Sequence, residues 1–251
     1  MNNVPNSSEN GPVKFVNSRG EAIDATHVLI SDVEYGAVWK GYIEAHMPRE
    51  LFKEVGLIDT LGSEEWFNVV EHSALVAAFA RMIAQELQTS GVDVSVTEVE
   101  RAAWVHDATK RRDVTESIRR EQEPSDDLLP RLLKENGYSD VEIAAAKNTG
   151  RVADRSLTDA DERQTAIRHH TVEENIVGYA DARVRGAKLM NTLDAAKIDS
   201  IQAKPGETDF FNNSWYPYYK DVEAYLSSMA DGYSAETVSI KAVAENLAHS
   251  T

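Results

Sequence analysis

Apolar residues recur at intervals of three and four along most of the chain from about Ala37 onward, a spacing typical of helices with one buried face. Residues 61–87 are the clearest case, because Gly62 and Ser63 supply a break and an N-cap ahead of the apolar run. Counting back along that face by three and four places His72 on it. The face is formed by Leu75, Val76, Phe79, Met82 and Ile83. The pattern therefore predicts a long helix with a buried histidine.

A second helix is predicted over residues 97–110, where Thr97 and Glu100 have the spacing of a capping box. Its buried stripe is formed by Val99, Ala102 and Ala103. The next member of that stripe is His106, and Asp107 lies beside it. This helix is thus expected to bring a histidine and an aspartate to a buried position.

A third helix is predicted to begin at Thr171, which has a capping-box spacing with Glu174. Its inner face is formed by Val177, Ala180 and Val184. Asp181 falls in the same stripe. Three helices that are far apart in the sequence therefore each place ionisable residues on a face that should be buried.

The rest of the periodic pattern predicts helices over residues 125–136, 139–147, 159–170, 215–229 and 235–247. Residues 13–30 alternate loosely around Ser18-Arg19-Gly20, which is compatible with a small β-hairpin. The fold class that follows is all-α, a helical bundle that can carry a small N-terminal hairpin.

Composition places the chain among globular proteins, because 42% of its residues are hydrophobic and 27% are charged. It has no cysteine, which excludes a disulfide framework, a zinc–thiolate site and a thiol nucleophile. Any metal site must therefore use His, Asp and Glu. No run approaches 18 apolar residues and no signal-peptide pattern opens the chain, so we expect a cytoplasmic protein with no membrane partner.

The formal net charge of −16 bears on the kind of partner. An acidic surface repels a polyanionic backbone, so a long nucleic acid is not expected. A small anion is different, because a few local cations and a metal can attract it even to an acidic protein. The simpler interpretation is that the acidity only aids solubility.

The four residues His72, His106, Asp107 and Asp181 together predict a bound divalent cation. A buried carboxylate without a partner costs on the order of several kcal/mol, so each acidic side chain needs one. Two carboxylates would offset the charge of the ion, and two neutral imidazoles would supply nitrogen ligands. Taken singly, each residue is more simply a hydrogen-bonded core residue or a cap. The combination on separate helices is what favours a metal.

The order of these residues, His, then His-Asp, then Asp, resembles the HD-domain superfamily of metal-dependent phosphohydrolases. The resemblance covers about residues 63–196. Its matching segments are Glu71-His72-Ser73, Trp104-Val105-His106-Asp107-Ala108-Thr109-Lys110 and Tyr179-Ala180-Asp181-Ala182-Arg183. It implies an HD-type helical bundle with a mononuclear or dinuclear metal centre that hydrolyses phosphoesters, often those of nucleotides.

The expected organisation has three parts. Residues 1–35 form a tail with the hairpin, residues 36–203 form the HD-type domain, and residues 204–251 form a C-terminal helical extension packed on the bundle. The sequence leaves open the identity of the divalent ion among Mn, Fe, Mg, Co, Ni and Zn. It also leaves open the oligomeric state, a homodimer included.

The chain departs from family members that bind two metals, which usually have further spaced histidines before the last aspartate. Only His169 and His170 occupy that interval, and neighbouring side chains on a regular helix point about 100° apart. This favours a single ion. At a helix end, however, one of the two could bind a second ion, orient the phosphate or act as a general acid. The alternative is a solvent-facing pair that the helix dipole stabilises.

The expected mechanism is attack by a metal-activated water on a phosphoester or phosphoanhydride bond of a small nucleotide-like substrate. Lys110 lies one helical turn beyond His106, so its ammonium could reach a phosphate held at the metal. The candidate catalytic residues are Asp107, Lys110, His169 and His170. The candidate substrate contacts are Lys110, Arg111 and Arg183.

Three alternatives remain open. An enzyme of the same fold could release triphosphate from a nucleotide, cleave a diadenosine polyphosphate or open a cyclic nucleotide. A non-catalytic nucleotide or metabolite sensor could retain the HD metal pocket. A helical interaction module could dock a partner on the aromatic residues 210–219 around Trp215, although packing of a C-terminal helix explains those residues as well.

Overall fold

The computed structural model describes residues 15–16, 22–23, 28–58, 66–111, 128–147, 149, 157–230 and 238–249. Its helices are α1 (Gly36–His46), α2 (Arg49–Glu54), α3 (Phe67–Thr89), α4 (Val96–Val105), α6 (Leu128–Glu135), α7 (Asp140–Lys147), α8 (Ala160–His169), α9 (Val172–Arg183), α10 (Leu193–Ala203), α11 (Thr208–Phe210), α12 (Tyr216–Ser228) and α13 (Ile240–His249). A 3₁₀ turn (Pro205–Glu207) and a π-helix (Phe211–Trp215) lie between α10 and α12. The strands are β1 (Phe15–Val16), β2 (Ala22–Ile23), β3 (Val184–Arg185) and β4 (Lys188–Leu189).

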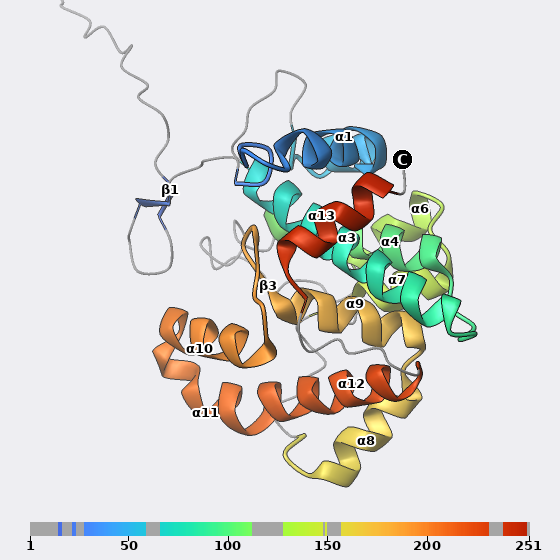
Figure 1. The fold of residues 1–251 in the computed structure, drawn as a ribbon, viewed down its shortest axis with the longest axis vertical. Helices are drawn as coiled ribbons and strands as arrows, with labels where there is room; N and C mark the ends of the chain where they lie inside the picture. The colour runs from blue at the N-terminus through green and yellow to red at the C-terminus, as the bar shows by residue number, and fades with distance from the viewer. Residues whose placement is uncertain are drawn as a thin grey trace, which may run out of the picture.

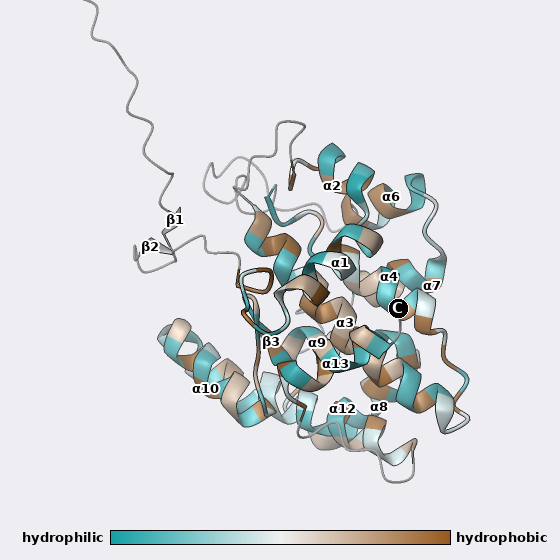
Figure 2. Ribbon diagram, turned by 45° about the horizontal axis from the view of Figure 1, so that its top comes forward, coloured by the Kyte–Doolittle hydropathy of each residue, from teal (hydrophilic) through white to brown (hydrophobic). Residues whose placement is uncertain are grey.

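Helix α3 forms the centre of the bundle and packs against α4 and α9 (Figure 1). Helices α1 and α13 pack on each other and on α3, while α8 and α12 lie on the other side, against each other. The run from Ala74 to Ala80 in α3 is fully buried. The outer helices α2 and α6 carry hydrophilic turns on their outside, as expected for helices that bury one face (Figure 2).

Helix α3 also has the length and composition of a membrane span, with a mean hydropathy of 1.2 over its best window. In the protein, 72% of that window is buried against other helices. The core helix of a globular bundle passes the same test, and α3 is such a helix.

The all-α fold class predicted from the sequence is confirmed, but some helix ends differ from the prediction. The break predicted at Gly62 and Ser63 lies outside the described residues. Helix α4 is capped by Ser95, whose hydroxyl accepts a hydrogen bond from the Glu98 backbone N–H, and not by Thr97. The capping box of Thr171 with its partner in α9 is present as predicted.

The reason for the shifted cap of α4 is the use of Glu100 elsewhere. Its carboxylate is buried and accepts hydrogen bonds from the Tyr42 hydroxyl at 2.8 Å and from the Arg81 guanidinium at 3.3 Å. His46 lies 3.1 Å from the same carboxylate. Glu100 thus ties α4 to α1 and α3, and is not available to cap its own helix.

Two antiparallel hairpins accompany the helices. The first pairs Phe15 with Ile23, within the segment where the sequence suggested one. The second, β3–β4, was not predicted. It turns at Gly186, whose φ of +57° is accessible to glycine, through a two-residue turn between Arg185 and Lys188. The sequence Gly-Ala at this turn lacks the Asn-Gly or Asp-Gly signal by which such turns are recognised.

The aromatic residues near Trp215 belong to the core. The rings of Phe211, Trp215 and Tyr219 pack edge to face at centroid distances of 5.2–5.7 Å, and all three side chains are buried, as is Tyr218. For these four residues the structure therefore agrees with the alternative of helix packing, and not with the alternative of a docking surface.

A buried carboxylate fixes the segment before α1 to the centre of the bundle. Glu71 in α3 is 1% exposed and accepts hydrogen bonds from the backbone N–H groups of Val28, Leu29 and Ile30 at 2.9–3.3 Å. Charge-assisted bonds of this kind are the strong ones, and leaving such donors unpaired costs free energy.

Replacing Glu71 with Gln should lower the free energy of unfolding by about 2 kcal/mol, because an amide brings N–H donors against backbone N–H donors. Urea denaturation followed by circular dichroism measures the change. The matched control is Glu86→Gln on the exposed side of the same helix, which should stay within about 0.5 kcal/mol of the original protein. Equal stabilities for the two variants would show that the Glu71 contacts contribute nothing.

Candidate metal centre

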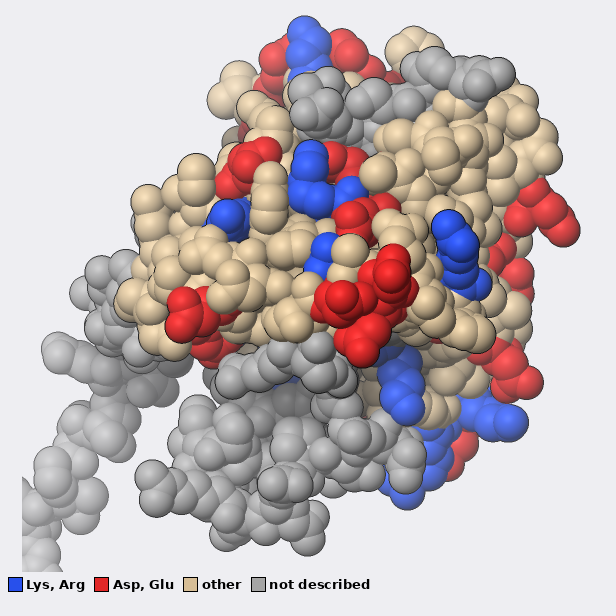
Figure 3. All heavy atoms as spheres, turned by 90° about the horizontal axis from the view of Figure 1, so that it is seen from below, with Lys and Arg blue, Asp and Glu red and all other residues tan. Residues whose placement is uncertain are grey.

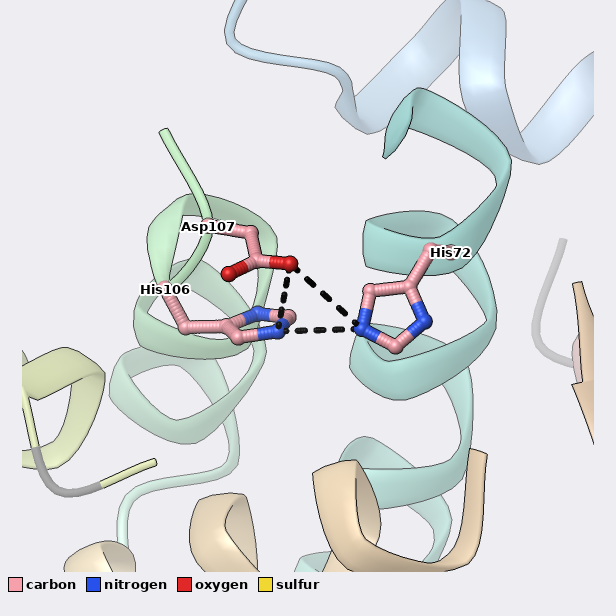
Figure 4. A group of neighbouring side chains, drawn as sticks. All are labelled: His72, His106 and Asp107. Atoms are coloured by element: carbon pink, nitrogen blue, oxygen red, sulfur yellow. Dashed lines mark hydrogen bonds and ion pairs between the residues drawn. The ribbon is translucent and has the colours of Figure 1, made fainter. Parts of the chain in front are cut away.

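Three helices position the ionisable residues that the sequence singled out. His72 lies in the second turn of α3, His106 is the C-cap of α4, and Asp107 follows it directly. Asp181 lies in the last turn of α9. Because α3 packs against both α4 and α9, these four residues meet at one place in the core, and Figure 4 shows three of them pointing toward a common point.

The distances between their polar atoms are those of ligands around one ion. The Nε2 atoms of His72 and His106 are 3.3 Å apart, and the Asp181 Oδ1 atom lies 3.2 Å and 3.4 Å from them. The Asp107 Oδ2 atom lies 3.8 Å from His72 Nε2 and 4.0 Å from His106 Nε2. Ligand atoms held about 2.0–2.2 Å from a shared cation have separations of this order.

Each imidazole is oriented by its other ring nitrogen. His72 Nδ1 lies 2.9 Å from the Gly186 carbonyl oxygen, and His106 Nδ1 lies 2.6 Å from the Ala103 carbonyl oxygen. A carbonyl only accepts, so each Nδ1 carries the proton and donates it. Each Nε2 then has a free lone pair in the neutral ring, which is how metal-binding histidines are prepared.

The centre is open on its carboxylate side. The His106 side chain is 1% exposed, whereas the Asp107 and Asp181 side chains are 23% and 22% exposed. Lys110 is half-exposed on this side, and its Nζ lies 3.4 Å from Asp107 Oδ1, the oxygen that does not face the imidazoles. A substrate anion would therefore approach past the carboxylates and the lysine.

Comparison with known families agrees with this geometry. The family model for the HD domain matches residues 69–202, which is more than half of the 251 residues and includes all four side chains. The chain belongs to the HD-domain family. No curated protein and no solved structure matches it significantly.

HD domains bind divalent metals, and the donor set of this HD domain fits one. It offers two imidazole nitrogens and two carboxylates, and His72, His106 and Asp107 have ligand atoms within 4.8 Å of one another. Without an ion, the two partly buried carboxylates would face the imidazoles, with Lys110 beside the outer oxygen of Asp107, and a dication between the four groups satisfies them better. Nitrogen and oxygen donors together suit borderline ions such as Mn, Fe, Co, Ni and Zn.

The charges of the HD centre control its protonation in the absence of metal. Burial acts to lower the pKa of His106, but the carboxylates of Asp107 and Asp181 outweigh it and raise that pKa to about 9. Burial acts to raise the pKa of Asp181, but hydrogen bonds from both imidazoles hold it far below its usual range. At neutral pH the metal-free centre therefore keeps a proton on His106 that a metal must displace.

Stability of the metal-free protein should accordingly depend on pH. A folded-state pKa of about 9 for His106 lies above its ordinary value of 6.5, so the stabilisation is complete below pH 6.5. It is lost as pH rises through about 9, and amounts to roughly 3 kcal/mol. We expect the Tm of the chelator-treated protein to fall between pH 6.5 and pH 9.5 in differential scanning calorimetry. A His106→Gln variant should not show this fall, and a Tm that rises over this range in the original protein would contradict the assignment.

The structure keeps His169 and His170 away from the metal centre. His170 precedes Asp181 by 11 residues, and α9 lies between them, so they are separated by roughly 16 Å along the helix axis. His170 pairs with Glu174 at 3.2 Å, at the capping box of α9, and His169 is exposed. The prediction that either residue takes part in catalysis is therefore corrected. The helix predicted from Thr171 to beyond Asp181 already implied this separation.

The predicted substrate contact of Arg183 is corrected by its surroundings. Arg183 is fully buried, and its guanidinium donates to the carbonyl oxygens of Met190 and Asn191 at 2.8–3.0 Å. It is enclosed by the fold and closed to a substrate. Arg111 is exposed, and its guanidinium donates to the Gly56 carbonyl oxygen just after α2 at 2.7 Å. Its role as a substrate contact stays a prediction.

Sequence reasoning missed the groups that orient the ligands. The carbonyl oxygens of Gly186 and Ala103 are backbone atoms, so no residue type marks them. A signal existed for one of them, because a carbonyl three residues before a histidine at a helix end lies within reach of its ring. The other depends on a hairpin that the pattern did not reveal.

Proposed function

We propose that this HD domain is a metal-dependent phosphohydrolase that cleaves a phosphoester or phosphoanhydride bond of a small nucleotide-like substrate. The observation that carries the proposal is the convergence of two oriented imidazoles and two carboxylates at an opening beside Lys110. That arrangement combines a divalent-ion site with a cation at its accessible edge.

A divalent ion bound there would polarise a phosphoryl oxygen and lower the pKa of a bound water toward neutrality. His72, His106, Asp107 and Asp181 would hold it. Phosphoryl transfer needs mainly positioning and neutralisation of charge on the transferred group.

Lys110 supplies further positive charge at this edge. Its ammonium contacts the outer oxygen of Asp107 and is half-exposed, so it can hold that carboxylate in place and attract a phosphate at the same time.

A small substrate also agrees with the charge of the surface. The net charge of −16 opposes a long polyanion. One face of the protein shows acidic side chains lying among the basic ones, so no single-sign basic track crosses its described residues (Figure 3). A compact anion that is bound by a metal and a few cations remains favourable.

The direct test measures metal content and phosphate release together. The purified protein is analysed by elemental mass spectrometry and then assayed with each candidate ion against nucleoside mono-, di- and triphosphates, a cyclic nucleotide and a diadenosine polyphosphate. We expect one divalent ion per chain and turnover of at least one substrate, with the products identifying the bond.

Lys110→Ala should retain the metal and lower kcat/KM by about 10²-fold, because one charge that stabilises the transition state is lost. The control Lys40→Ala removes an exposed lysine from α1 and should leave kcat/KM unchanged. Tight binding of a nucleotide without turnover for any ion would instead support a sensor that retains the HD metal pocket.

A further inference from the structure

Two of the four candidate metal ligands lie just beyond the end of a regular helix. Helix α4 ends at Val105, and His106 and Asp107 begin the chain of turns that follows it. One turn is closed by a hydrogen bond from the Ala108 N–H to the Val105 carbonyl oxygen at 3.0 Å. The next is closed by a bond from the Lys110 N–H to the Asp107 carbonyl oxygen at 2.9 Å. Bonds between residues three apart have poorer geometry than those of an α-helix, so the place of Asp107 depends on what fixes the far end of these turns.

The far end of the turns is joined to α2 by a contact that spans 55 residues of sequence. Arg111 Nη1 donates a hydrogen bond to the Gly56 carbonyl oxygen at 2.7 Å. Gly56 follows the end of α2, and its own N–H bonds to the Lys53 carbonyl oxygen at 3.0 Å. The last carbonyl groups of a helix lack donors within it, and a cation there also offsets the negative end of the helix dipole. A guanidinium is therefore well suited to this position.

The surface that receives the guanidinium requires glycine for two reasons. The φ of Gly56 is +73°, a left-handed conformation that glycine adopts at little cost. A Cβ atom on Gly56 would also fall on Nη1 of Arg111, so any other residue would displace the guanidinium. Gly91, Gly137 and Gly186 also have positive φ, but nothing lies within 4 Å of a Cβ atom placed on any of them. Among the positive-φ glycines of the described residues, the close approach thus belongs to Gly56.

Helix α2 is a fixed support for this contact because it packs on α4. Leu51, Phe52 and Leu57 are buried, and the Phe52 ring lies 6.4 Å from the ring of Trp104 in α4. The Leu57 N–H bonds back to the Phe52 carbonyl oxygen at 2.8 Å, which holds the chain on both sides of Gly56. The metal ligands that follow α4 therefore lie between two contacts with α2, a ring contact before them and the guanidinium after them.

We propose that Arg111 is a positioning residue of the metal centre, which fixes Asp107 and Lys110 by holding the end of their segment on the Gly56 carbonyl. This inference rests on the proposed function. Arg111 follows Lys110 directly and Asp107 by four residues, so a shift of its backbone moves both. The 3.4 Å contact between Lys110 Nζ and Asp107 Oδ1 depends on the same stretch of backbone.

The primary test measures Mn²⁺ affinity of the full-length metal-free protein by competition with a chelator. Arg111→Ala and Gly56→Ala should each weaken Mn²⁺ binding by about three- to tenfold, because one charged hydrogen bond that orients the ligand segment is lost. The double variant Gly56→Ala/Arg111→Ala should lose no more than the larger single effect, since both changes remove the same contact.

Two controls separate the contact from strain and from charge. Gly91→Ala introduces the same left-handed strain after α3, where no side chain is displaced. Arg168→Ala removes an exposed arginine from α8. Both should keep Mn²⁺ affinity within about twofold of the original protein. Urea denaturation of all variants should show equal losses of stability for Gly56→Ala and Gly91→Ala apart from the one exposed hydrogen bond.

Titration of the Mn²⁺-saturated protein with orthophosphate separates positioning from direct contact with the substrate. If Arg111 acts through Lys110, phosphate affinity should fall by about threefold or more in both Arg111→Ala and Gly56→Ala. If the guanidinium instead bound the phosphate, Gly56→Ala would release it for that purpose and leave phosphate affinity equal or higher.

The outcomes that would overturn the inference are distinct from those that would overturn the proposed function. Equal Mn²⁺ affinities in Arg111→Ala, Gly56→Ala and the two controls would contradict the positioning role alone. Loss of phosphate affinity in Arg111→Ala only, with unchanged Mn²⁺ affinity, would assign the guanidinium to the substrate instead. Absence of Mn²⁺ binding by the original protein would overturn both proposals.

Discussion

Replacing His106 with alanine is expected to remove the divalent ion and lower phosphohydrolase activity by at least about 10³-fold. Activation of water and neutralisation of phosphoryl charge by an ion are together worth several kcal/mol, and each 1.36 kcal/mol is a factor of ten in rate. The imidazole is one of the two nitrogen donors of the centre, and its side chain is only 1% exposed. Asp107→Asn should have the same effect, because an amide of equal size is a much weaker ligand than a carboxylate.

Elemental analysis, kcat/KM on the best substrate and far-ultraviolet circular dichroism are measured on the same preparations. The helical signal should persist, since α3, α4 and α9 keep their apolar contacts. His249→Ala is the matched control, because this exposed histidine near the end of α13 bonds only to a carbonyl one turn earlier. Full activity with normal metal content in both His106→Ala and Asp107→Asn would remove the basis of the proposed function.

Arg183→Ala is expected to lower the free energy of unfolding by about 3–5 kcal/mol, because a fully buried charge network loses its central member. The guanidinium donates to the carbonyl oxygens of Met190 and Asn191 and to the Tyr179 hydroxyl at 2.6 Å. That hydroxyl donates in turn to the buried carboxylate of Glu223 at 2.6 Å. Removing the guanidinium leaves the Met190 and Asn191 carbonyl oxygens without this donor and the Tyr179 hydroxyl without its charged partner, while Glu223 keeps its ion pair with Lys220.

The same substitution should weaken metal binding by about 10- to 100-fold, the range found when the groups that orient metal ligands are altered. Arg183 fixes the base of the hairpin whose tip orients His72. Urea denaturation and competition with a chelator measure the two effects separately. Arg168→Ala replaces an exposed arginine in α8 and serves as the control. It should change neither the free energy of unfolding nor the free energy of metal binding by more than about 0.5 kcal/mol. If Arg183→Ala matched that control, the buried network would be without energetic importance.

Helical periodicity in the sequence was sufficient to predict the bundle and the convergence of the four side chains. His72, His106 and Asp181 each continue an apolar stripe, and a stripe on a helix must face other helices, so the stripes had to meet. The periodic pattern contains distances only within one helix. The helix predicted from Thr171 already separates His170 from Asp181, but the pattern could not show that the chain after Asp181 turns back as a hairpin.

The contacts that the sequence could not reveal involve polar groups buried by tertiary structure. Arg183 was a weaker candidate for a substrate contact, suggested by its place two residues after Asp181. Its burial depends on carbonyl oxygens supplied by the chain eight residues later and on an acid in α12. Glu71 is likewise an unremarkable helix residue until the segment 28–30 is placed against it. Such partners are specified by the fold as a whole.

The buried glutamates determine how much of the chain is needed for a stable fold. The family match spans residues 69–202. The backbone N–H groups that donate to Glu71, however, belong to residues 28–30, and a hydroxyl that donates to Glu100 belongs to Tyr42. Beyond the C-terminal end of the matched span, Glu223 accepts the hydrogen bond from the Tyr179 hydroxyl. A polypeptide trimmed to the matched span would leave the Glu71 carboxylate without these donors, Glu100 with Arg81 but without Tyr42, and the Tyr179 hydroxyl without its acceptor. A buried carboxylate without donors alone costs several kcal/mol, roughly, against a total stability of about 5–15 kcal/mol. The flanking segments are thus part of the folding unit, and we expect the excised span to be unstable.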